Sequence, residues 1–434
     1  MITDNKMPIN NCYKFSHRRT MSSFLVCVLL ADAVAFIAIF VTGGGLLSSL
    51  IWNGETFGIF PDFFETLMNA EYLRPYSDGA IYPAFVYLVF YPLSKLTGFG
   101  IHSIGFTASS ITQRGSIIGI YFFLIFTILY WIILSKIADA NQMEKVAILA
   151  VLLMSPGYIF LIDRGNIVIM TATMIAAFLY LYLDNNSGAF RYQRLNYFIS
   201  ICFLCFAVCM KLYPVLFGLI LLKKRDWKNI RNSLIVLSCT FFFPFFAIRE
   251  DRPIHQMIYN IFYLNGGNAH DSRGFGYGYM VSITTIMRAC LKWLGWQMPS
   301  WISRMVEIIA CGVIIFIAIM SSTWWKRIMA ITVGMIILPG FSFIYNDIYL
   351  FLPLMFYFKE EPFIKKGNIR YFILFMICVA CLPYGYVMRS LPGANKMSVG
   401  TLIEATAMTL MVLIVFIETC FETNKKLLLF IKKD

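Results

Sequence analysis

Met21–Thr42 reads MSSFLVCVLLADAVAFIAIFVT, an apolar run of about twenty residues with Asp32 as its one charged side chain. A helix of that length crosses the roughly 30 Å hydrocarbon layer of a bilayer. His17, Arg18 and Arg19 precede the run, which is longer than a signal peptide's apolar core and lacks a small-residue cleavage site. We therefore expect a first helix that stays in the membrane with its N-terminus inside.

The rest of the chain repeats this pattern. Of 434 residues, 59% are hydrophobic and 14% charged, whereas a soluble domain has about a quarter of its residues charged. We therefore predict an all-α, polytopic membrane protein of about 12 transmembrane helices, as a single integral-membrane domain over residues 1–434. Eleven more spans are expected, at about 80–97, 115–135, 145–162, 165–183, 197–222, 232–249, 301–322, 328–344, 347–358, 371–388 and 400–422.

The net charge of +13 comes from basic residues in short segments between apolar runs. This is the pattern of cytoplasmic loops under the positive-inside rule, so no nucleic-acid partner is expected. When the predicted spans alternate from an inside N-terminus, four basic segments fall in the cytoplasm, including the tail 423–434. These segments contain Lys223, Lys224, Arg225, Lys228, Arg231; Lys326, Arg327; Lys359, Lys365, Lys366, Arg370; Lys425, Lys426, Lys432 and Lys433.

Two long loops, at about 43–79 and 250–300, fall on the opposite, periplasmic side. In the second, Tyr279–Trp296 alternates apolar and basic residues and predicts an amphipathic helix at the membrane interface. The scattered histidines and cysteines form no metal-ligand spacing, and no glycine-rich phosphate loop is present. We expect no metal and no cofactor.

The motifs that carry chemistry begin in the first long loop, where Asp62-Phe63 precedes a short amphipathic stretch and Tyr82-Pro83 opens the next apolar run. Three further motifs follow along the chain: Asp163-Arg-Gly-Asn166, Lys211-Leu-Tyr-Pro214 and Phe341–Tyr349. Their order and spacing resemble GT-C fold integral-membrane glycosyltransferases. The resemblance is closest to the bacterial polyprenyl-phosphate-mannose-dependent α-mannosyltransferase-like family.

The chain departs from that family in three places. In Phe341–Tyr349, Asn346 and Asp347 stand where relatives carry a polar hairpin, often with histidine. Ala84 stands where the family's Tyr-Pro element has a second proline, and the Asp163–Asn166 element lacks the family's glutamine. The resemblance implies a GT-C fold and transfer of a single mannose-like or glucose-like hexose from a polyprenyl-phosphate donor to a glycan or glycolipid acceptor. It further implies a bacterial inner-membrane enzyme with cytoplasmic termini and a periplasmic active site.

The resemblance also assigns site residues. Asp62 would be the general base that takes the acceptor's proton, with Glu65, one helical turn on, as the second catalytic candidate. Basic loop residues would hold the donor phosphate, and tyrosines would contact the sugar. The expected substrate-binding residues are Tyr76, Tyr82, Lys211, Tyr213, Arg252, His270, Arg273, Asn346 and Asp347.

Several alternatives stay open. Asp62 is also suited to cap a helix, and Lys211 to form an ion pair with Asp32. Arg164 falls on the cytoplasmic side of the predicted topology, which favours a capping role unless segment 80–97 is re-entrant. An O-antigen polymerase or ligase would rely on loop arginines such as Arg252, Arg273 and Arg288, and a polytopic transporter or flippase is the third possibility.

Overall fold

The structure, a computed structural model, describes residues 9–44, 51, 60–97, 113–183, 190–223, 227–264, 279–296, 298–340, 342–361, 368–382, 388–389 and 397–431. Most of these residues lie in helices, and the regular strands among them are two short ones that form an antiparallel pair. The predicted all-α, polytopic membrane protein is confirmed.

Five of the described helices are long and apolar enough to cross a membrane, and α5 (Gln142–Met154) with α6 (Pro156–Arg164) makes a sixth if the pair, bent by 59°, is one span. The other predicted spans correspond to shorter helices, and the number twelve stays a prediction. The five long helices are α1 (Ile9–Val41), α4 (Gln113–Ile137), α10 (Trp227–Phe242, extended by η5, Phe243–Ala247), α14 (Ser300–Met320) and α18 (Val399–Ile431).

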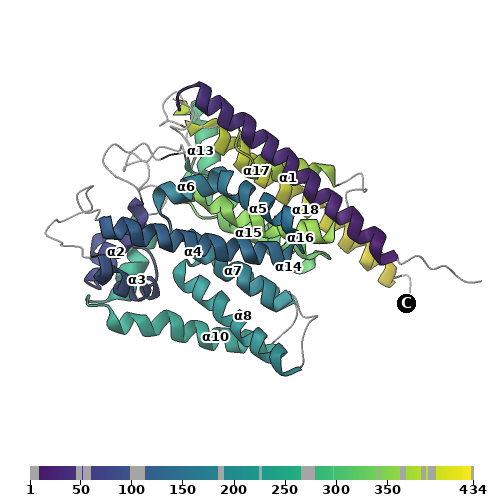
Figure 1. Cartoon of the computed structure of the whole chain (residues 1–434). Helices are drawn as coiled ribbons and strands as arrows, with labels where there is room; N and C mark the ends of the chain where they lie inside the picture. The colour runs from purple at the N-terminus through teal and green to yellow at the C-terminus, as the bar shows by residue number, and fades with distance from the viewer. Residues whose placement is uncertain are drawn as a thin grey trace, which may run out of the picture.

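The shorter elements fill the space between and above these helices (Figure 1). They are α2 (Pro61–Glu71), η2 (Tyr76–Asp78), α3 (Ala84–Thr97), α7 (Val168–Leu183), α8 (Phe190–Met210), η4 (Tyr213–Phe217), α9 (Gly218–Lys223), α11 (Pro253–Tyr259), η6 (Asn260–Leu264), α13 (Ile283–Trp293), α15 (Trp324–Ile337), η8 (Ile344–Leu350), α16 (Phe351–Glu360), α17 (Ile369–Val379), β1 (Met388–Arg389) and β2 (Met397–Ser398).

The centre of the molecule is made by α7, α15 and α16, which are apolar on all sides and buried along most of their length. The outer helices α1, α4 and α14 instead expose large apolar side chains such as Phe40, Ile120 and Ile308. A water-facing surface would carry polar groups at these positions. The exposed apolar faces are therefore the ones that contact lipid.

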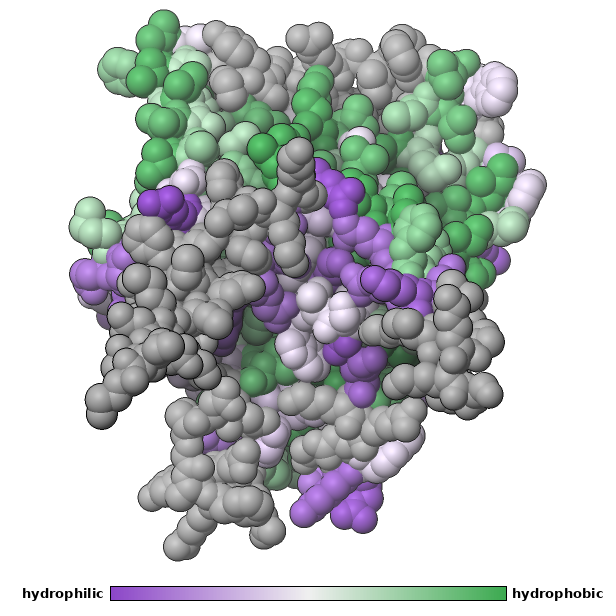
Figure 2. All heavy atoms as spheres, turned by 90° about the vertical axis from the view of Figure 1, so that its right-hand side faces the viewer, coloured by the Kyte–Doolittle hydropathy of each residue, from purple (hydrophilic) through white to green (hydrophobic). Residues whose placement is uncertain are grey.

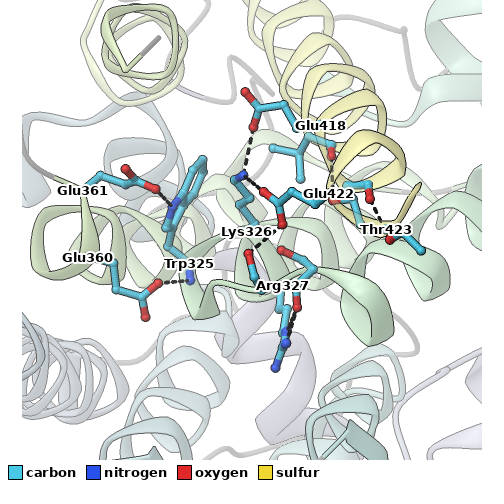
Figure 3. Close-up of polar contacts among 12 residues, drawn as sticks. Trp325, Lys326, Arg327, Glu360, Glu361, Glu418, Glu422 and Thr423 are labelled. Carbon is cyan, nitrogen blue, oxygen red and sulfur yellow. Dashed lines mark hydrogen bonds and ion pairs between the residues drawn. The ribbon is translucent and has the colours of Figure 1, made fainter. Parts of the chain in front are cut away.

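One end of the bundle holds the last turns of α18 and is called the tail end here. Lys326, at the start of α15, forms ion pairs with Glu418 (2.9 Å) and Glu422 (3.0 Å) of α18. Figure 3 shows this lysine between the two carboxylates, with the neighbouring Trp325 bonded to Glu360 and Glu361. These contacts tie the start of α15 to the ends of α16 and α18.

The start of α1 and the start of α5 also lie at the tail end. Phe24 of α1 packs against Phe358 and Phe372, at the end of α16 and the start of α17. Ser22 donates a hydrogen bond to Glu144, in the first turn of α5. Because a short turn joins α4 to α5, α4 ends at the tail end, and its 25 residues carry its start to the opposite end.

The opposite end is called the site end and holds α2 and α3 (Figure 1). Tyr82, just before α3, lines the same cavity as Asp62 at the start of α2, and Lys95 near the end of α3 pairs with Glu71 at the end of α2. The 14-residue α3 therefore lies along the short α2 and stays at this end. Segment 80–97, predicted as a span unless it is re-entrant, forms this shorter apolar helix at the site end, because hydropathy does not distinguish a short apolar helix packed on a neighbour from a span.

Because α3 stays at the site end, Arg164 lies at the other end of the bundle from the one predicted. The pair α5–α6 starts at the tail end and runs back, so Arg164 ends at the site end, beside Asp62. The predicted topology put Arg164 at the same end as the basic segments, and the structure places it at the opposite end.

A second difference from the predicted topology compensates for the first, so that later segments again lie at the predicted ends of the bundle. Segment 197–222, predicted as one span, is interrupted at Lys211 between α8 and η4. The backbone N–H of Arg249 donates to Leu73 (2.8 Å), so the end of α10 is at the site end, and its start, after α9, is at the tail end. Figure 2, which views the tail end, shows hydrophilic side chains across its middle and hydrophobic ones along its upper border. The basic residues Lys223, Lys326 and Lys359 thus share one end, as the sequence predicts.

Candidate active site

The helix α2 is held rigidly at the site end. Pro61 starts it, at a position where the missing N–H costs nothing, and Asp62 lies in its first turn, where a carboxylate is favoured by the helix dipole. Its apolar face is fully buried: Phe63 packs edge-on against Phe90 and Phe123. The opposite face is left to present Asp62 and Glu65 to a cavity.

The end of α6 is fixed against the start of α2. Gly165 ends α6 with φ +64, and a Cβ added there would lie 2.6 Å from the Cβ of Phe60. Only glycine combines this left-handed backbone with so close a neighbour. The N–H of Phe60 donates to the carbonyl of Asp163 (3.2 Å), so the residues that follow α6 are placed directly over Asp62.

A continuous chain of polar contacts crosses the site. Arg164 forms an ion pair with Oδ1 of Asp62, and Asn166 donates from Nδ2 to Oδ2 of Asp62 at 2.6 Å. Asn166 Oδ1 in turn accepts from Lys211 Nζ at 3.0 Å and from the N–H of Val168 at 3.2 Å. Asp62 is thereby fixed to Arg164 by a direct ion pair and to Lys211 through the amide of Asn166.

Lys211 lies at the break between α8 and η4 and is buried. The rings of Tyr345, Tyr82 and Tyr213 surround its ammonium group, with centroids 5.0, 5.5 and 5.8 Å away. Aromatic faces attract a cation at these distances and compensate part of its lost hydration. Tyr213 also donates to Asn346 (3.1 Å), which anchors η8 to the same cluster.

These groups line one cavity of about 510 Å³. Its walls come from α2, the segment before α3, the end of α6, the break at Lys211, and η8 with the residues before it. The lining residues are Asp62, Glu65, Thr66, Asn69, Asp78, Gly79, Ala80, Ile81, Tyr82, Pro83, Tyr87, Arg164, Asn166, Lys211, Leu212, Tyr213, Ile261, Pro339, Gly340, Phe343, Tyr345 and Asn346.

Glu65 is a second carboxylate on α2 that faces the cavity, beside Asp62. Its side chain is accessible to solvent through the cavity, and no hydrogen bond or ion pair joins it to another described side chain. The surrounding protein removes much of its hydration and, with the nearby charge of Asp62, raises the pKa of Glu65 from 4.5 to about 7, against the opposing effect of Arg164. A carboxylate with a pKa near neutrality is suited to proton transfer.

A model of glycosyltransferase family 87 matches residues 80–353, which is more than half of the chain. The chain belongs to glycosyltransferase family 87. No curated protein was found to match it. The family membership confirms the predicted membrane glycosyltransferase and favours it over a transporter, while the closer likeness to the polyprenyl-phosphate-mannose enzymes stays a prediction.

Within this family 87 glycosyltransferase, the cavity brings together residues far apart in sequence. Tyr82, Arg164, Asn166, Lys211 and Tyr345 fall inside the matched region. The two carboxylates of α2 precede it, so the cavity joins the matched region to the loop before it.

Most of the predicted site residues meet in this cavity: Asp62, Glu65, Tyr82, Lys211, Tyr213 and Asn346. Three others do not line it, contrary to prediction. Tyr76 is buried beneath it and donates to the carbonyl of Tyr82 (3.1 Å). Asp347 is buried on the other side of η8, next to Glu404, and Arg252 is exposed at the start of α11. His270 and Arg273 lie outside the described residues.

Arg164, Asn166 and Tyr345 were not predicted as site residues of this glycosyltransferase. The Asp163–Asn166 element was the available indication, but the predicted topology put it on the other side of the membrane. The predicted alternative of an ion pair between Lys211 and Asp32 is wrong, since Asp32 accepts from the backbone N–H of Cys381 (2.7 Å) and Lys211 donates to Asn166.

The amphipathic helix predicted within Tyr279–Trp296 is present as α13, and its Arg288 donates to Ser303 of α14 (3.2 Å). This contact fixes α13 beside the start of α14, and no described residue of α13 lines the cavity.

Proposed function

We propose that this protein transfers a single mannose-like or glucose-like hexose from a polyprenyl-phosphate donor to a glycan or glycolipid acceptor. The observation that carries the proposal is the contact chain Asp62–Asn166–Lys211, with Arg164 on the same carboxylate, lining one cavity at one end of a membrane bundle. It supplies, within a few ångströms, a proton acceptor and two cations. Sugar transfer from a lipid phosphate needs both.

The reaction uses these charges as follows. An acceptor hydroxyl attacks the anomeric carbon, a new C–O bond forms, and the bond from that carbon to the phosphate oxygen breaks. The hydroxyl proton passes to the Asp62–Glu65 pair, with Asp62 as the base, and polyprenyl phosphate leaves with one more negative charge than it had as a diester. Cationic groups beside the leaving phosphate accelerate the reaction most, because they stabilise the negative charge that develops on it.

Arg164 and Lys211 are the groups placed to receive the phosphate. Lys211 donates one N–H to Asn166, so its other two N–H bonds are left for a ligand. Arg164 presents a planar fork that suits phosphate oxygens. Because Arg164 contacts both Asp62 and the expected position of the phosphate, donor binding and proton acceptance share this residue.

The charge distribution supports a periplasmic location of the cavity. Lys223, Lys326 and Lys359 lie at the tail end, and under the positive-inside rule this supports a cytoplasmic tail end and a cavity at the periplasmic face of the inner membrane. A polyprenyl-linked sugar is held in the bilayer by its tail, and Leu212 and Ile261 give the cavity apolar wall on which the first prenyl units can lie.

The polymerase or ligase alternative relies on loop arginines. Arg252 lies outside the cavity, Arg288 is hydrogen-bonded to Ser303, and Arg273 lies outside the described residues. Among the described arginines, the one that lines the cavity is Arg164. The cavity therefore favours transfer from a monophosphate donor.

The test uses purified protein in lipid nanodiscs, radiolabelled polyprenyl-phosphate mannose and glucose, and a membrane glycolipid extract. The wild type is expected to transfer label, and Asp62→Asn to fold and lose transfer by a factor of about 10² to 10⁴. Asp139→Asn, an exposed aspartate at the tail end, is the matched control and keeps full activity. Transfer from diphosphate-linked glycans alone would contradict the proposal.

A further inference from the structure

A second cavity, of about 500 Å³, lies beside the first and takes no part in the chemistry above. It is lined by Arg74, Ser77, Arg249, Glu250, Asp251 and Gln256. All of its lining residues are polar, and most are exposed to solvent. It therefore suits a hydrophilic ligand and offers no surface to a lipid tail.

The cavity is built where the two long loops lock together. Glu250 accepts hydrogen bonds from the N–H of Tyr76 (3.1 Å) and from the N–H and Oγ of Ser77 (both 2.8 Å). Asn260 donates from Nδ2 to the carbonyls of Tyr76 (2.8 Å) and Ala80 (2.9 Å). These bonds fix the walls in place without a ligand, which lowers the ordering cost of binding.

The groups that face the cavity are available for a ligand. Glu250 is committed to three donors of the first loop, so its charge is largely satisfied. By contrast, no described residue receives a hydrogen bond or ion pair from the guanidinium of Arg74 or Arg249. With Asp251 and Gln256 beside them, they offer forked donors and carbonyl or carboxylate acceptors, the combination that pairs with neighbouring sugar hydroxyls.

The second cavity adjoins the first through consecutive residues. Ser77 lines the second cavity, whereas Asp78, Gly79 and Ala80 line the first. Neighbouring Cα atoms are 3.8 Å apart, so the two cavities share a wall at Ser77 and Asp78, and they are close enough for the successive sugars of one glycan.

We propose that the second cavity binds the glycan part of the acceptor, in the sugars beyond the one whose hydroxyl reacts. This rests on the proposed function, and it adds that the enzyme selects acceptors by the length of their glycan. Arg74 and Arg249 hold the distal sugars, while Asp62 and its neighbours act on the reacting hydroxyl.

The test compares synthetic alkyl trisaccharides and matching alkyl monosaccharides of mannose, glucose and galactose, as acceptors and as ligands in a donor-free binding assay. The double variant Arg74→Ala, Arg249→Ala is expected to weaken binding of the preferred trisaccharide and to raise its KM, by about tenfold per arginine. Its kcat, its donor KM and its KM for monosaccharides stay as in the wild type. Arg304→Ala, an exposed arginine of α14 outside both cavities, is the matched control.

Other outcomes overturn the proposal. Unchanged trisaccharide binding would mean that the cavity holds no acceptor sugars, and a raised donor KM would mean that it holds the donor or another lipid headgroup instead. A fall in kcat with all acceptors would mean a structural role. Because the binding assay needs no donor, it gives a result even if polyprenyl-phosphate sugars prove not to be the donors, so the two proposals fail separately.

Discussion

Replacing Glu65 by glutamine is expected to remove the pH dependence of transfer near neutrality. Desolvation by the surrounding protein and the charge of Asp62 raise the pKa of Glu65 from 4.5 to about 7, against the opposing charge of Arg164. A raised pKa means that Glu65 is ionised only above about pH 7, so the Asp62–Glu65 pair carries both negative charges only there. The pair accepts a proton more strongly in that state, and activity should rise with pH.

The size of the effect follows from the pKa of Glu65. With a pKa of about 7, about a tenth of the molecules have Glu65 ionised at pH 6 and about nine tenths at pH 8. The ionised fraction of Glu65, and with it the contribution of Glu65 to the rate of transfer, should therefore be about tenfold larger at pH 8 than at pH 6. In Glu65→Gln this rise disappears, and the rate at pH 8 falls by a factor of about 10².

The assay is single-turnover transfer from a radiolabelled polyprenyl-phosphate sugar between pH 5.5 and 9 (a range of about three units centred near the titration). Glu71→Gln, on the same helix but paired with Lys95 outside the cavity, should keep the wild-type profile. If Glu65→Gln keeps the rise near pH 7, another group titrates there, and the role given to the Asp62–Glu65 pair is refuted.

Two further variants test the site and its scaffold. Lys211→Met should lower kcat by a factor of about 10² to 10³, because a charge that stabilises the leaving phosphate is lost, while Lys95→Met should not; an unchanged kcat would place the phosphate elsewhere. Gly165→Ala should lower stability by about 1–3 kcal/mol, read as a lower Tm, because its φ of +64 and the contact with Phe60 both oppose a side chain. Gly218→Ala, with open space around its Cα, should leave Tm almost unchanged, and equal Tm values for the two would contradict this account.

The apolar runs predicted the helices well because each run has to satisfy its own backbone within lipid. The apolar runs did not predict which helices extend from one end of the bundle to the other. The segment of α3 is as apolar as a short span, but its place beside α2 depends on contacts such as Lys95 with Glu71, which no local pattern encodes. The break at Lys211 likewise depends on the aromatic cage and on Asn166, which are distant in sequence.

The sequence predicted those site residues that lie in recognisable motifs, and it missed those whose position depends on the number of preceding membrane crossings. Asp62, Glu65 and Lys211 carry charges whose positions are unusual enough to be noticed in the sequence alone. Arg164 and Asn166 were visible as a motif, but one miscounted crossing put them on the wrong side. In a membrane protein, one miscounted crossing assigns every following residue to the wrong end of the bundle, until a second miscount corrects the order.

The most direct test of the account is a structure of the protein in nanodiscs with bound polyprenyl phosphate, the leaving product. The account predicts the phosphate in the cavity, with its oxygens about 3 Å from Lys211 Nζ and the guanidinium of Arg164, and with the prenyl chain passing Leu212 toward lipid. A phosphate bound at the tail end, or in the second cavity against Arg74 and Arg249, would contradict it.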